Sequence, residues 1–337
     1  MKKYRLTLIL AALLIVWLIA GPQLISRLTS TLTYTTGLPA GVSLTGRLFF
    51  TQGFGGVWQV ALPAGTVSQW WQPPDEGLVM GIAASPDGQQ FAIAYAPPAA
   101  EGFQSGTTDL YLSGSAAPNA QPLLTREVAN ESFRNPFWSP DGRWLYYTHL
   151  KPILKEDGTA SGVELTVERI EPGDTGAAEV VLHAAEQASL SPDGQQIVFL
   201  QFDPKTYSRT LTIANLDGSR SAALIPAGAY QALAGPKFDP SGGVLVSASG
   251  DLQIQAASAG IVRAHGLPWN ILHVINSDQT PTKLTPFTLD GPWLDWSPDG
   301  QDFAVLSAEG VFVVHEGQFY RVADSSGEGE ITWAGGS

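Results

Sequence analysis

Apolar and polar positions follow one repeated pattern over most of the chain. A polar turn, Ser-Pro-Asp-Gly, precedes a run in which nearly every residue is apolar, as in "SPDGRWLYYT" from Ser139 and "SPDGQDFAVL" from Ser297. Further copies begin at Ser85 and Ser191, and a degenerate copy, "DPSGGVLVS", begins at Asp239. A strand that is apolar on both faces is buried on both sides. The pattern therefore predicts a buried strand after each turn.

The turn residues and their spacing indicate the architecture. Pro presets φ, the Ser and Asp side chains can bond nearby backbone N–H groups, and Gly accepts the positive φ that closes a hairpin. The first residues of successive turns lie 54, 52, 48 and 58 positions apart. Repeats of roughly 40 to 50 residues that hold several short strands are typical of propeller blades and not of helical solenoids.

Each repeat also contains two further stretches with strand character. The first follows the buried strand, at residues 108–114, 163–170, 209–218, 271–278 and 310–317. The second comes next, at residues 122–125, 178–183, 222–226, 282–285 and 318–324. With the strand that enters each turn, this makes four strands per repeat, the number in a propeller blade.

The two ends of the chain together predict a sixth blade. The C-terminal "ITWAGGS" places Trp333 where Trp138 and Trp296 stand, directly before a turn, and the sequence ends there. "TGRLFFTQ" resumes from Thr45 as if just after a turn. We therefore expect an all-β fold, a six-bladed β-propeller of four-stranded blades over residues 46–337, closed by pairing of the C-terminal strand with the N-terminal blade. Such closure removes a free sheet edge that would favour aggregation.

The turn, the apolar strand and the "LTIANLDG" type of strand after it together resemble the WD-like repeats of TolB-type β-propellers. The resemblance covers about residues 46–337 and implies the propeller fold. It implies little about activity, because this repeat occurs on proteins of unrelated function. TolB proteins carry an α/β domain before the propeller, whereas only about 18 residues lie between residue 27 and the first blade strand here, so the resemblance is limited to the propeller.

The N-terminus differs in kind from the repeats. Lys2, Lys3 and Arg5 precede residues 6–25, which are 20 positions without a charge and about enough for one membrane crossing. We expect a signal anchor, or transmembrane helix, over residues 1–27. A cleaved secretory signal peptide remains the alternative.

The charge distribution around this segment predicts its orientation. The basic residues before the span outnumber Arg27 after it, which favours a cytoplasmic N-terminus. The propeller is then extracytoplasmic on a single-pass protein of the cell membrane, or secreted or periplasmic if the signal is cleaved. Residues 28–45 are uncharged and rich in Thr, and we expect them to form a linker.

Composition excludes several classes of function. The net charge of −13 argues against nucleic acid as a partner, because such proteins need a basic surface. The absence of Cys excludes disulfides, thiolate metal sites and a Cys nucleophile. The sequence contains no G-x-S-x-G, no H-E-x-x-H and no phosphate-binding G-x-x-x-x-G-K-[ST]. We therefore predict no enzyme activity, no catalytic or metal-binding residues and no cofactor.

The connections between the second and third strands of the blades suggest where a partner binds. They are long at residues 96–108, 149–162 and 250–270 and intermediate at 202–209, whereas the Ser-Pro-Asp-Gly turns are tight and predict a plain opposite face. Aliphatic and aromatic anchors usually dominate protein interfaces. The candidate interface residues in these loops are Leu150, Ile153, Leu154, Ile261, Leu267 and Trp269.

Charged residues gather in the connections that enter the innermost strands, and these connections should surround one mouth of the central channel. The candidate channel-mouth residues are Glu131, Arg134, Glu186, Lys237, Asp290, Asp295 and Glu330. Carboxylates could hold a hard cation such as Ca²⁺, whereas Arg134 and Lys237 oppose a purely anionic mouth. Whether a cation binds in the channel stays open.

These observations favour a membrane-anchored extracytoplasmic propeller that binds protein, as an interaction module or an accessory subunit of an envelope complex. One alternative is a glycan- or small-ligand-binding sensor, which the ten Trp suggest and an exposed aromatic platform would support. A second is a propeller lyase or hydrolase, which would need His and carboxylate side chains converging at the channel mouth. A broad apolar patch would favour the protein binder.

Overall fold

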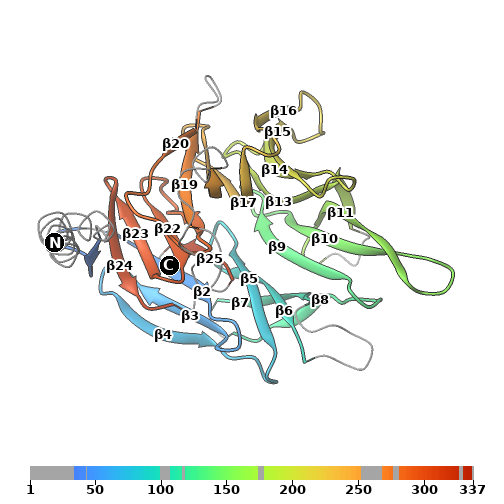
Figure 1. Cartoon of the computed structure of the whole chain (residues 1–337). Helices are drawn as coiled ribbons and strands as arrows, with labels where there is room; N and C mark the ends of the chain where they lie inside the picture. The colour runs from blue at the N-terminus through green and yellow to red at the C-terminus, as the bar shows by residue number, and fades with distance from the viewer. Residues whose placement is uncertain are drawn as a thin grey trace, which may run out of the picture. The chain divides into compact units, whose positions relative to one another are not determined.

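Six sheets fan out around a common centre (Figure 1); each holds four antiparallel strands, and one has a fifth, parallel strand at its outer edge. The structure is a computed structural model that describes residues 34–42, 44–98, 107–115, 118–173, 178–251, 268–275, 281–325 and 329–335. Residues 34–337 form one unit, to which all the sheets belong. The arrangement confirms the predicted all-β, six-bladed β-propeller.

The strands of each blade follow one another along the chain, except in blade 1. From the innermost strand outward, blade 1 consists of β25 (Ile331–Ala334), β2 (Arg47–Thr51), β3 (Val57–Ala61) and β4 (Thr66–Trp71). Blade 2 consists of β5 (Leu78–Ala84), β6 (Gln90–Ala96), β7 (Asp109–Gly114) and β8 (Gln121–Leu124). Blade 3 consists of β9 (Ser132–Trp138), β10 (Leu145–Leu154), β11 (Ala160–Ile170) and β12 (Glu179–His183).

The second half of the ring repeats this order. Blade 4 consists of β13 (Ala185–Leu190), β14 (Gln196–Phe202), β15 (Arg209–Asn215) and β16 (Ala222–Ile225). Blade 5 consists of β17 (Tyr230–Phe238), β18 (Val244–Asp251), β19 (Trp269–Val274) and β20 (Pro281–Lys283). Blade 6 consists of β21 (Trp293–Trp296), β22 (Phe303–Ser307), β23 (Gly310–His315) and β24 (Gln318–Ala323), with β1 (Thr35–Thr36) outside β24.

The Ser-Pro-Asp-Gly turns join the first and second strands through a repeated set of hydrogen bonds. In blade 3 the Ser139 hydroxyl donates to Asp141 Oδ1 at 2.5 Å and accepts from the Trp144 amide at 2.9 Å. The Gly142 amide donates to the Ser139 carbonyl, and Gly142 has a φ of 70° that favours glycine. Blades 2, 4 and 6 repeat the bond between the Ser hydroxyl and Asp.

The second strand of each blade is buried on both faces, as its apolar sequence predicts. In β10, Leu145, Tyr146 and Tyr147 have at most 1% of their surface exposed, although they point alternately to opposite faces of the sheet. β6 and β22 follow the same pattern. Each such strand therefore supplies the apolar contacts on both sides of its blade.

The two ends of the propeller meet in blade 1. β25 pairs antiparallel with β2, which places Trp333 opposite Leu48 and Ile331 opposite Phe50. All four side chains are buried in one apolar cluster that also includes residues of blade 6. The Trp333 indole N–H also donates to the carbonyl of Thr45 at 3.0 Å.

Part of the predicted linker belongs to blade 6. Thr35 and Thr36 pair parallel with β24, and the Tyr34 ring packs edge-on against Phe287 and Phe312. The outer strand of a blade presents unpaired N–H and C=O groups, and this segment satisfies some of them. The linker prediction for residues 28–45 relied on uncharged, Thr-rich composition, which does not distinguish a linker from an added edge strand.

The predicted signal anchor, residues 1–27, lies outside the described residues. Within the part of the chain that the structure describes, no helix is long and apolar enough to cross a membrane.

Candidate functional site

The two faces of the propeller differ in which connections they carry. We call the face with the Ser-Pro-Asp-Gly turns the turn face, and the face with the connections between second and third strands the loop face. Exposed large apolar side chains gather in the loop-face connections and at the start of an inner strand. They are Phe54, Met80, Ile153, Leu154 and Tyr207. Val67 and Val180 are also exposed, but they lie on outer strands, and exposed Ile275 follows β19, outside the loop-face connections.

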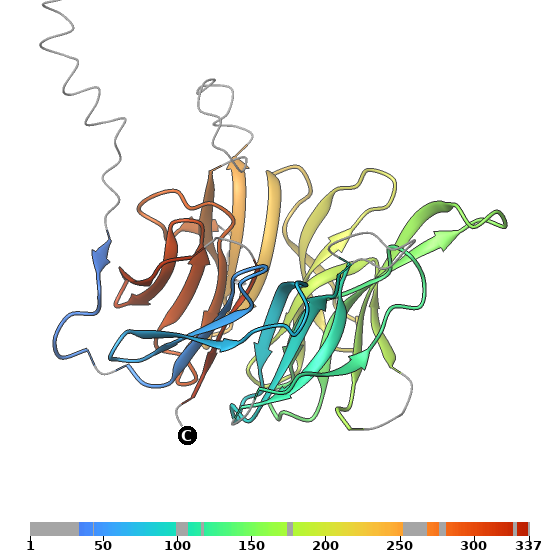
Figure 2. The ribbon, with the colours of Figure 1, turned by 90° about the horizontal axis from the view of Figure 1, so that it is seen from below.

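A long hairpin dominates the loop face. β10 and β11 have ten and eleven residues, whereas the other second strands have five to eight. The hairpin extends beyond the ring of blades, as Figure 2 shows. We call its distal part, residues 150–163, the arm. Ile153 and Leu154 lie near its end and are 51% and 46% exposed.

The predicted interface residues fall into three groups. Leu150, Ile153 and Leu154 lie on the arm, with Leu150 partly buried. Trp269 begins β19, is partly buried, and exchanges backbone hydrogen bonds with Leu289 at 2.9 and 3.0 Å. Ile261 and Leu267 lie outside the described residues. Sequence reasoning missed Phe54 and Tyr207, because each is a single apolar residue in a short polar or Gly-rich stretch, and Met80, because it lies in an apolar strand whose exposed position has no signal of its own.

A buried ionic cluster holds the base of the arm. His149 on β10 lies between two carboxylates: its Nε2 is 2.9 Å from Glu131 Oε1, and its Nδ1 is 2.9 Å from Glu168 Oε1. The Tyr147 hydroxyl donates to Glu168 Oε2 at 3.0 Å. The imidazole also stacks on Phe133, with ring centroids 4.6 Å apart. The cluster therefore joins β9, β10 and β11 where the arm leaves the blade.

The pKa shifts in this cluster favour the charged state of all three groups. Burial alone would lower the pKa of His149, but its hydrogen bonds to Glu168 and Glu131 outweigh burial and raise that pKa. Burial alone would raise the pKa of both carboxyls. For Glu131, hydrogen bonds from the Glu127 amide and from His149 outweigh the effect of burial. For Glu168, hydrogen bonds from His149 and Thr166 outweigh it. Both carboxyl pKa values therefore lie below their usual value.

The geometry indicates a structural role for this cluster rather than acid–base chemistry. Both ring nitrogens of His149 are already occupied by carboxylates, so neither is free to take a proton from a ligand. No group of His, Asp and Glu side chains among the described residues has the arrangement of a metal site.

The central channel is nearly filled. Residues from the inner strands of all six blades line a cavity of about 30 Å³, space for about one or two water molecules. The Glu330 carboxylate lies across it, where it accepts from Asn135 Nδ2 at 2.5 Å. A Cβ at position 81 would lie 2.9 Å from Glu330 Oε2, so Gly81 leaves room for this carboxyl.

The predicted channel-mouth residues do not form one ring. Lys237 Nζ pairs with Asp295 Oδ1 at 3.2 Å near the turn face, whereas Glu330 lies deeper in the channel. Each of the other four, Glu131, Arg134, Glu186 and Asp290, has a bonding partner of its own. Glu131 bonds His149, Arg134 Nε donates to Ser132 Oγ, Glu186 pairs with Arg209, and the Asp290 amide donates to Glu309.

Glu330 predicts a pH-dependent stability. Burial raises its pKa to about 7 from an ordinary value of 4.5, so folding disfavours the ionised form. Stability should fall as pH rises from 4.5 to 7 and level off above, a total cost of about 3 kcal/mol. Glu330→Gln mimics the neutral acid and should be more stable than the wild type at pH 8 by that amount, with no gain at pH 4.

Urea unfolding at several pH values measures this difference. Glu164→Gln, at an exposed position, serves as the matched control and should change stability little at any pH. If Glu330→Gln has the same stability as the wild type at pH 8, Glu330 is not the costly buried charge that its surroundings indicate.

The turn face carries a concave site that the sequence did not predict. A bowl of about 330 Å³ opens there, lined by residues from all six blades. Its aromatic lining consists of Phe137, Trp138, Phe238, Trp296 and Trp333. The turns themselves are tight, as expected, but their tightness says nothing about the space that they enclose.

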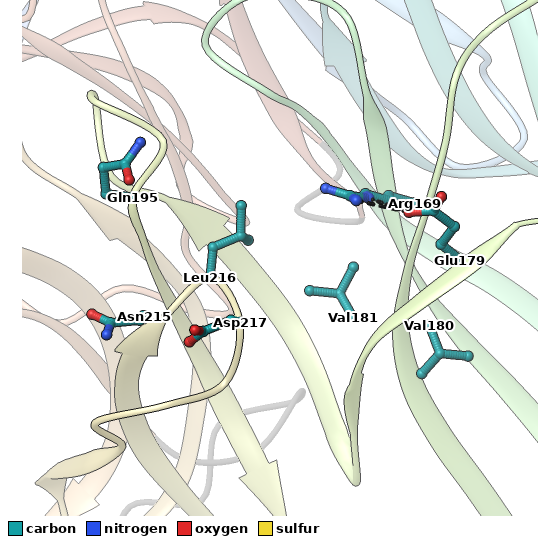
Figure 3. Close-up of a pocket in the computed structure, with 8 residues that line it drawn as sticks. All are labelled: Arg169, Glu179, Val180, Val181, Gln195, Asn215, Leu216 and Asp217. Carbon is teal, nitrogen blue, oxygen red and sulfur yellow. Dashed lines mark hydrogen bonds and ion pairs between the residues drawn. The ribbon is translucent and has the colours of Figure 1, made fainter.

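A larger and more open groove of about 660 Å³ runs between the outer parts of blades 3 and 4 (Figure 3). Its lining residues are Arg169, Glu179, Val180, Val181, Gln195, Asn215, Leu216 and Asp217. Arg169 stacks 4.3 Å over the Trp144 ring and pairs with Glu179 at 2.7 Å. Its guanidinium is therefore engaged by the protein itself and is a weak anchor for a ligand.

Comparisons with known proteins place the fold but not the function. No protein-family profile matches the chain. No curated protein sequence matches it either. TolB from Acinetobacter baumannii is 16% identical with a TM-score of 0.59, and the match covers 86% of this chain and 66% of that one. A putative TolB from Agrobacterium tumefaciens is 15% identical with a TM-score of 0.54, covering 82% and 87%.

A third similar structure comes from a complex of nidogen and laminin. It is 11% identical with a TM-score of 0.57, and the match covers 86% of this chain and 98% of that one. These similarities confirm the resemblance to TolB-type β-propellers at the level of the fold. At such identities they carry no information on ligands or partners.

Proposed function

We propose that this protein is a membrane-anchored, extracytoplasmic interaction module that binds another protein through its loop face, as an accessory subunit of an envelope complex. The observation that carries the proposal is the concentration of exposed apolar side chains on that face. Ile153 and Leu154 on the arm are exposed, and so are Phe54 and Tyr207 in connections of two other blades. Projecting aliphatic and aromatic side chains are typical anchors of protein interfaces.

Within the described residues, the central channel offers no site for a small ligand. The channel cavity of about 30 Å³ is too small for a substrate. Of the ten Trp, all but Trp17 lie in the described part of the chain, and each of those is buried or partly buried. The described surface therefore offers little of the exposed aromatic platform on which sugars stack.

Two features support the arm as a binding element and not as a tolerated insertion. The ionic cluster around His149 fixes its base, so less conformational freedom is lost when a partner binds its tip. β25 pairs with β2, and we propose that this closure keeps the ring of blades rigid beneath the arm. The similar structure from a nidogen and laminin complex is compatible with protein binding by this fold.

Replacing the arm anchors should weaken partner capture without unfolding the protein. We expect Ile153→Ala with Leu154→Ala to reduce recovery of the partner at least about tenfold. The melting temperature should stay within about 2 °C, because both side chains are exposed. The measurement is affinity purification of the detergent-solubilised full-length protein with quantitative mass spectrometry.

The matched control is Val67→Ala with Val180→Ala, which removes two equally exposed apolar side chains from outer strands. The control should capture the partner as the wild type does. Equal capture by the arm variant and the wild type, or equal loss in both variants, would show that the loop face is not the binding surface.

The membrane anchor rests on the N-terminal sequence. Three basic residues precede 20 uncharged positions, which supports a cytoplasmic N-terminus and an exported propeller. Alkaline phosphatase fused after Ser337 should therefore be active, and the protein should fractionate with membranes after carbonate washing. An inactive fusion would contradict export, and a mature N-terminus at residues 21–30 would replace the anchor by a cleaved signal.

A further inference from the structure

The bowl at the turn face is a closed-ended, partly aromatic cavity with six-fold pseudo-symmetry. Its volume is about 330 Å³, at the lower end of the range of small-molecule sites. The nearly filled channel below it forms the floor. The residue directly before each turn contributes to the wall. These residues are Ala84, Trp138, Leu190, Phe238, Trp296 and Trp333.

The tryptophan rings are held in place by contacts with the protein itself. Trp138 Nε1 donates to the Ala83 carbonyl of the neighbouring blade at 3.2 Å, and Trp333 Nε1 donates to Thr45 at 3.0 Å. Trp296 packs edge-on against Phe303, with ring centroids 5.3 Å apart. The walls are therefore preorganised, so a ligand would not have to order them.

Four exposed carboxylates belong to the turns that directly follow four of the wall residues, and they stand next in sequence to the turn prolines, three of which line the bowl. They are Asp87, Asp141, Asp193 and Asp299, one from each intact turn. In each, Oδ1 accepts from the turn Ser hydroxyl and from the amide two residues later. These bonds lower the pKa of all four Asp carboxyls, and the bond from the Ser hydroxyl has the largest effect in each. The four groups are therefore ionised at neutral pH, and each Oδ2 faces no partner among the described residues.

The cations near the bowl offset only part of this charge, since of the four turn carboxylates only Asp141 has a pKa that a nearby cation, Arg143, helps to lower. Lys237 in the wall pairs with Asp295 at 3.2 Å, and Arg143 beside one turn pairs with Glu171 at 3.4 Å. The site thus combines a negative rim with aromatic walls. Cations bind favourably over Trp rings, and carboxylates accept guanidinium N–H groups in pairs.

We propose that the bowl binds an arginine- or lysine-bearing segment of a flexible peptide, with the cationic side chain inserted between the Trp rings and its neighbours held by the Asp rim. This site lies on the face opposite the arm and is independent of the proposed loop-face interaction. An acidic segment or a nucleic acid would be repelled by the rim. Pro86, Pro140 and Pro298 line the bowl beside the turns and offer apolar contact to the peptide backbone.

The test uses a fluorescein-labelled, acetylated hexa-arginine peptide and the full-length protein in detergent, measured by fluorescence anisotropy. The rim variant combines Asp87→Asn, Asp141→Asn, Asp193→Asn and Asp299→Asn. Each Asn retains the oxygen that accepts the turn hydrogen bonds, so the turns should keep their shape. We expect the rim variant to bind the peptide at least about tenfold more weakly at about 0.15 M salt.

The matched control removes the same number of charges from other positions, three of them exposed and one, Asp203, partly exposed. It combines Asp157→Asn, Glu164→Gln, Asp203→Asn and Asp324→Asn, and should lose less than about twofold in affinity. Equal weakening in both variants would mean that the peptide senses only the net charge of the protein, which would overturn the proposal. Unchanged binding to the rim variant would overturn it as well.

A second variant separates insertion into the bowl from attraction to its rim. Ala84→Phe narrows the bowl without changing any charge, and should weaken peptide binding by at least about fivefold, with thermal unfolding used to verify the fold. If this variant does not fold, photo-crosslinking of the wild type with a benzophenone-labelled peptide answers the same question. Crosslinks should map to residues 83–86, 137–140 and 295–298, and crosslinks confined to other surfaces would contradict the site.

Discussion

Deletion of residues 331–337 should unfold the propeller or lower its melting temperature by about 10 °C or more. The deletion removes the whole of β25, including Ile331 and Trp333, which are 3% and 5% exposed. Losing a single buried Trp side chain costs about 3 to 5 kcal/mol, and the pairing with β2 is lost as well. That sum is comparable with the whole stability of an ordinary domain.

Thermal unfolding followed by circular dichroism tests this expectation. Deletion of residues 336–337 alone is the matched control, because it shortens the chain but leaves β25 in place. The control should melt at the temperature of the wild type. If the protein lacking residues 331–337 has the melting temperature of the wild type, the pairing of β25 with β2 does not stabilise the fold.

His149→Ala should destabilise the fold by about 3 to 5 kcal/mol at pH 6, the cost of leaving buried charges without their partner. Glu131 and Glu168 would remain in a site where their side chains are 5% and 12% exposed. His183→Ala is the control, because the His183 side chain is 75% exposed and its one carboxylate neighbour in the described structure, Glu164, is at the longer distance of 3.8 Å. The control should change stability by less than about 0.5 kcal/mol in the same urea titration.

The pH dependence distinguishes this cluster from simple loss of packing. The pKa of His149 is raised, so its contribution is complete below pH 6.5 and is lost as pH rises through the folded value. The pKa values of Glu131 and Glu168 are lowered, so their contribution is complete above pH 4.5 and is lost on acidification. The contribution of this cluster to stability should therefore be largest between these limits, and the deficit of His149→Ala relative to the wild type should be largest there. A deficit that is the same at every pH would contradict a charged cluster.

The fold could be predicted from sequence because local signals repeat. Each turn combines Pro, Asp and Gly at fixed offsets, and each copy is followed by a strand such as that from Leu145, apolar at consecutive positions. A degenerate copy, such as that from Asp239, can be identified by its spacing from the intact copies. β1 was missed because nothing repeats it, and two Thr residues that pair with a blade edge have no pattern of their own.

The sites were less predictable because they depend on which side chains converge. His149 was separated in sequence from both of its carboxylate partners by 18 and 19 residues, and only the register of β9, β10 and β11 brings the three together. The bowl likewise forms only where side chains from all six blades converge. Ala84 and Leu190 stand where other blades carry Trp, so the space arises from size differences around a ring that no single repeat displays.

Site-specific photo-crosslinking in intact cells tests the central claim, that the loop face binds a protein partner. A photoreactive phenylalanine analogue would replace Ile153 or Tyr207 on the loop face, and Val67 or Val180 on outer strands, each in the full-length protein. All four side chains are exposed, so replacement should not disturb the fold. The account predicts a discrete adduct of higher mass from Ile153 and Tyr207 and none from Val67 and Val180. Adducts from the outer strands alone, or from none of the four positions, would contradict it.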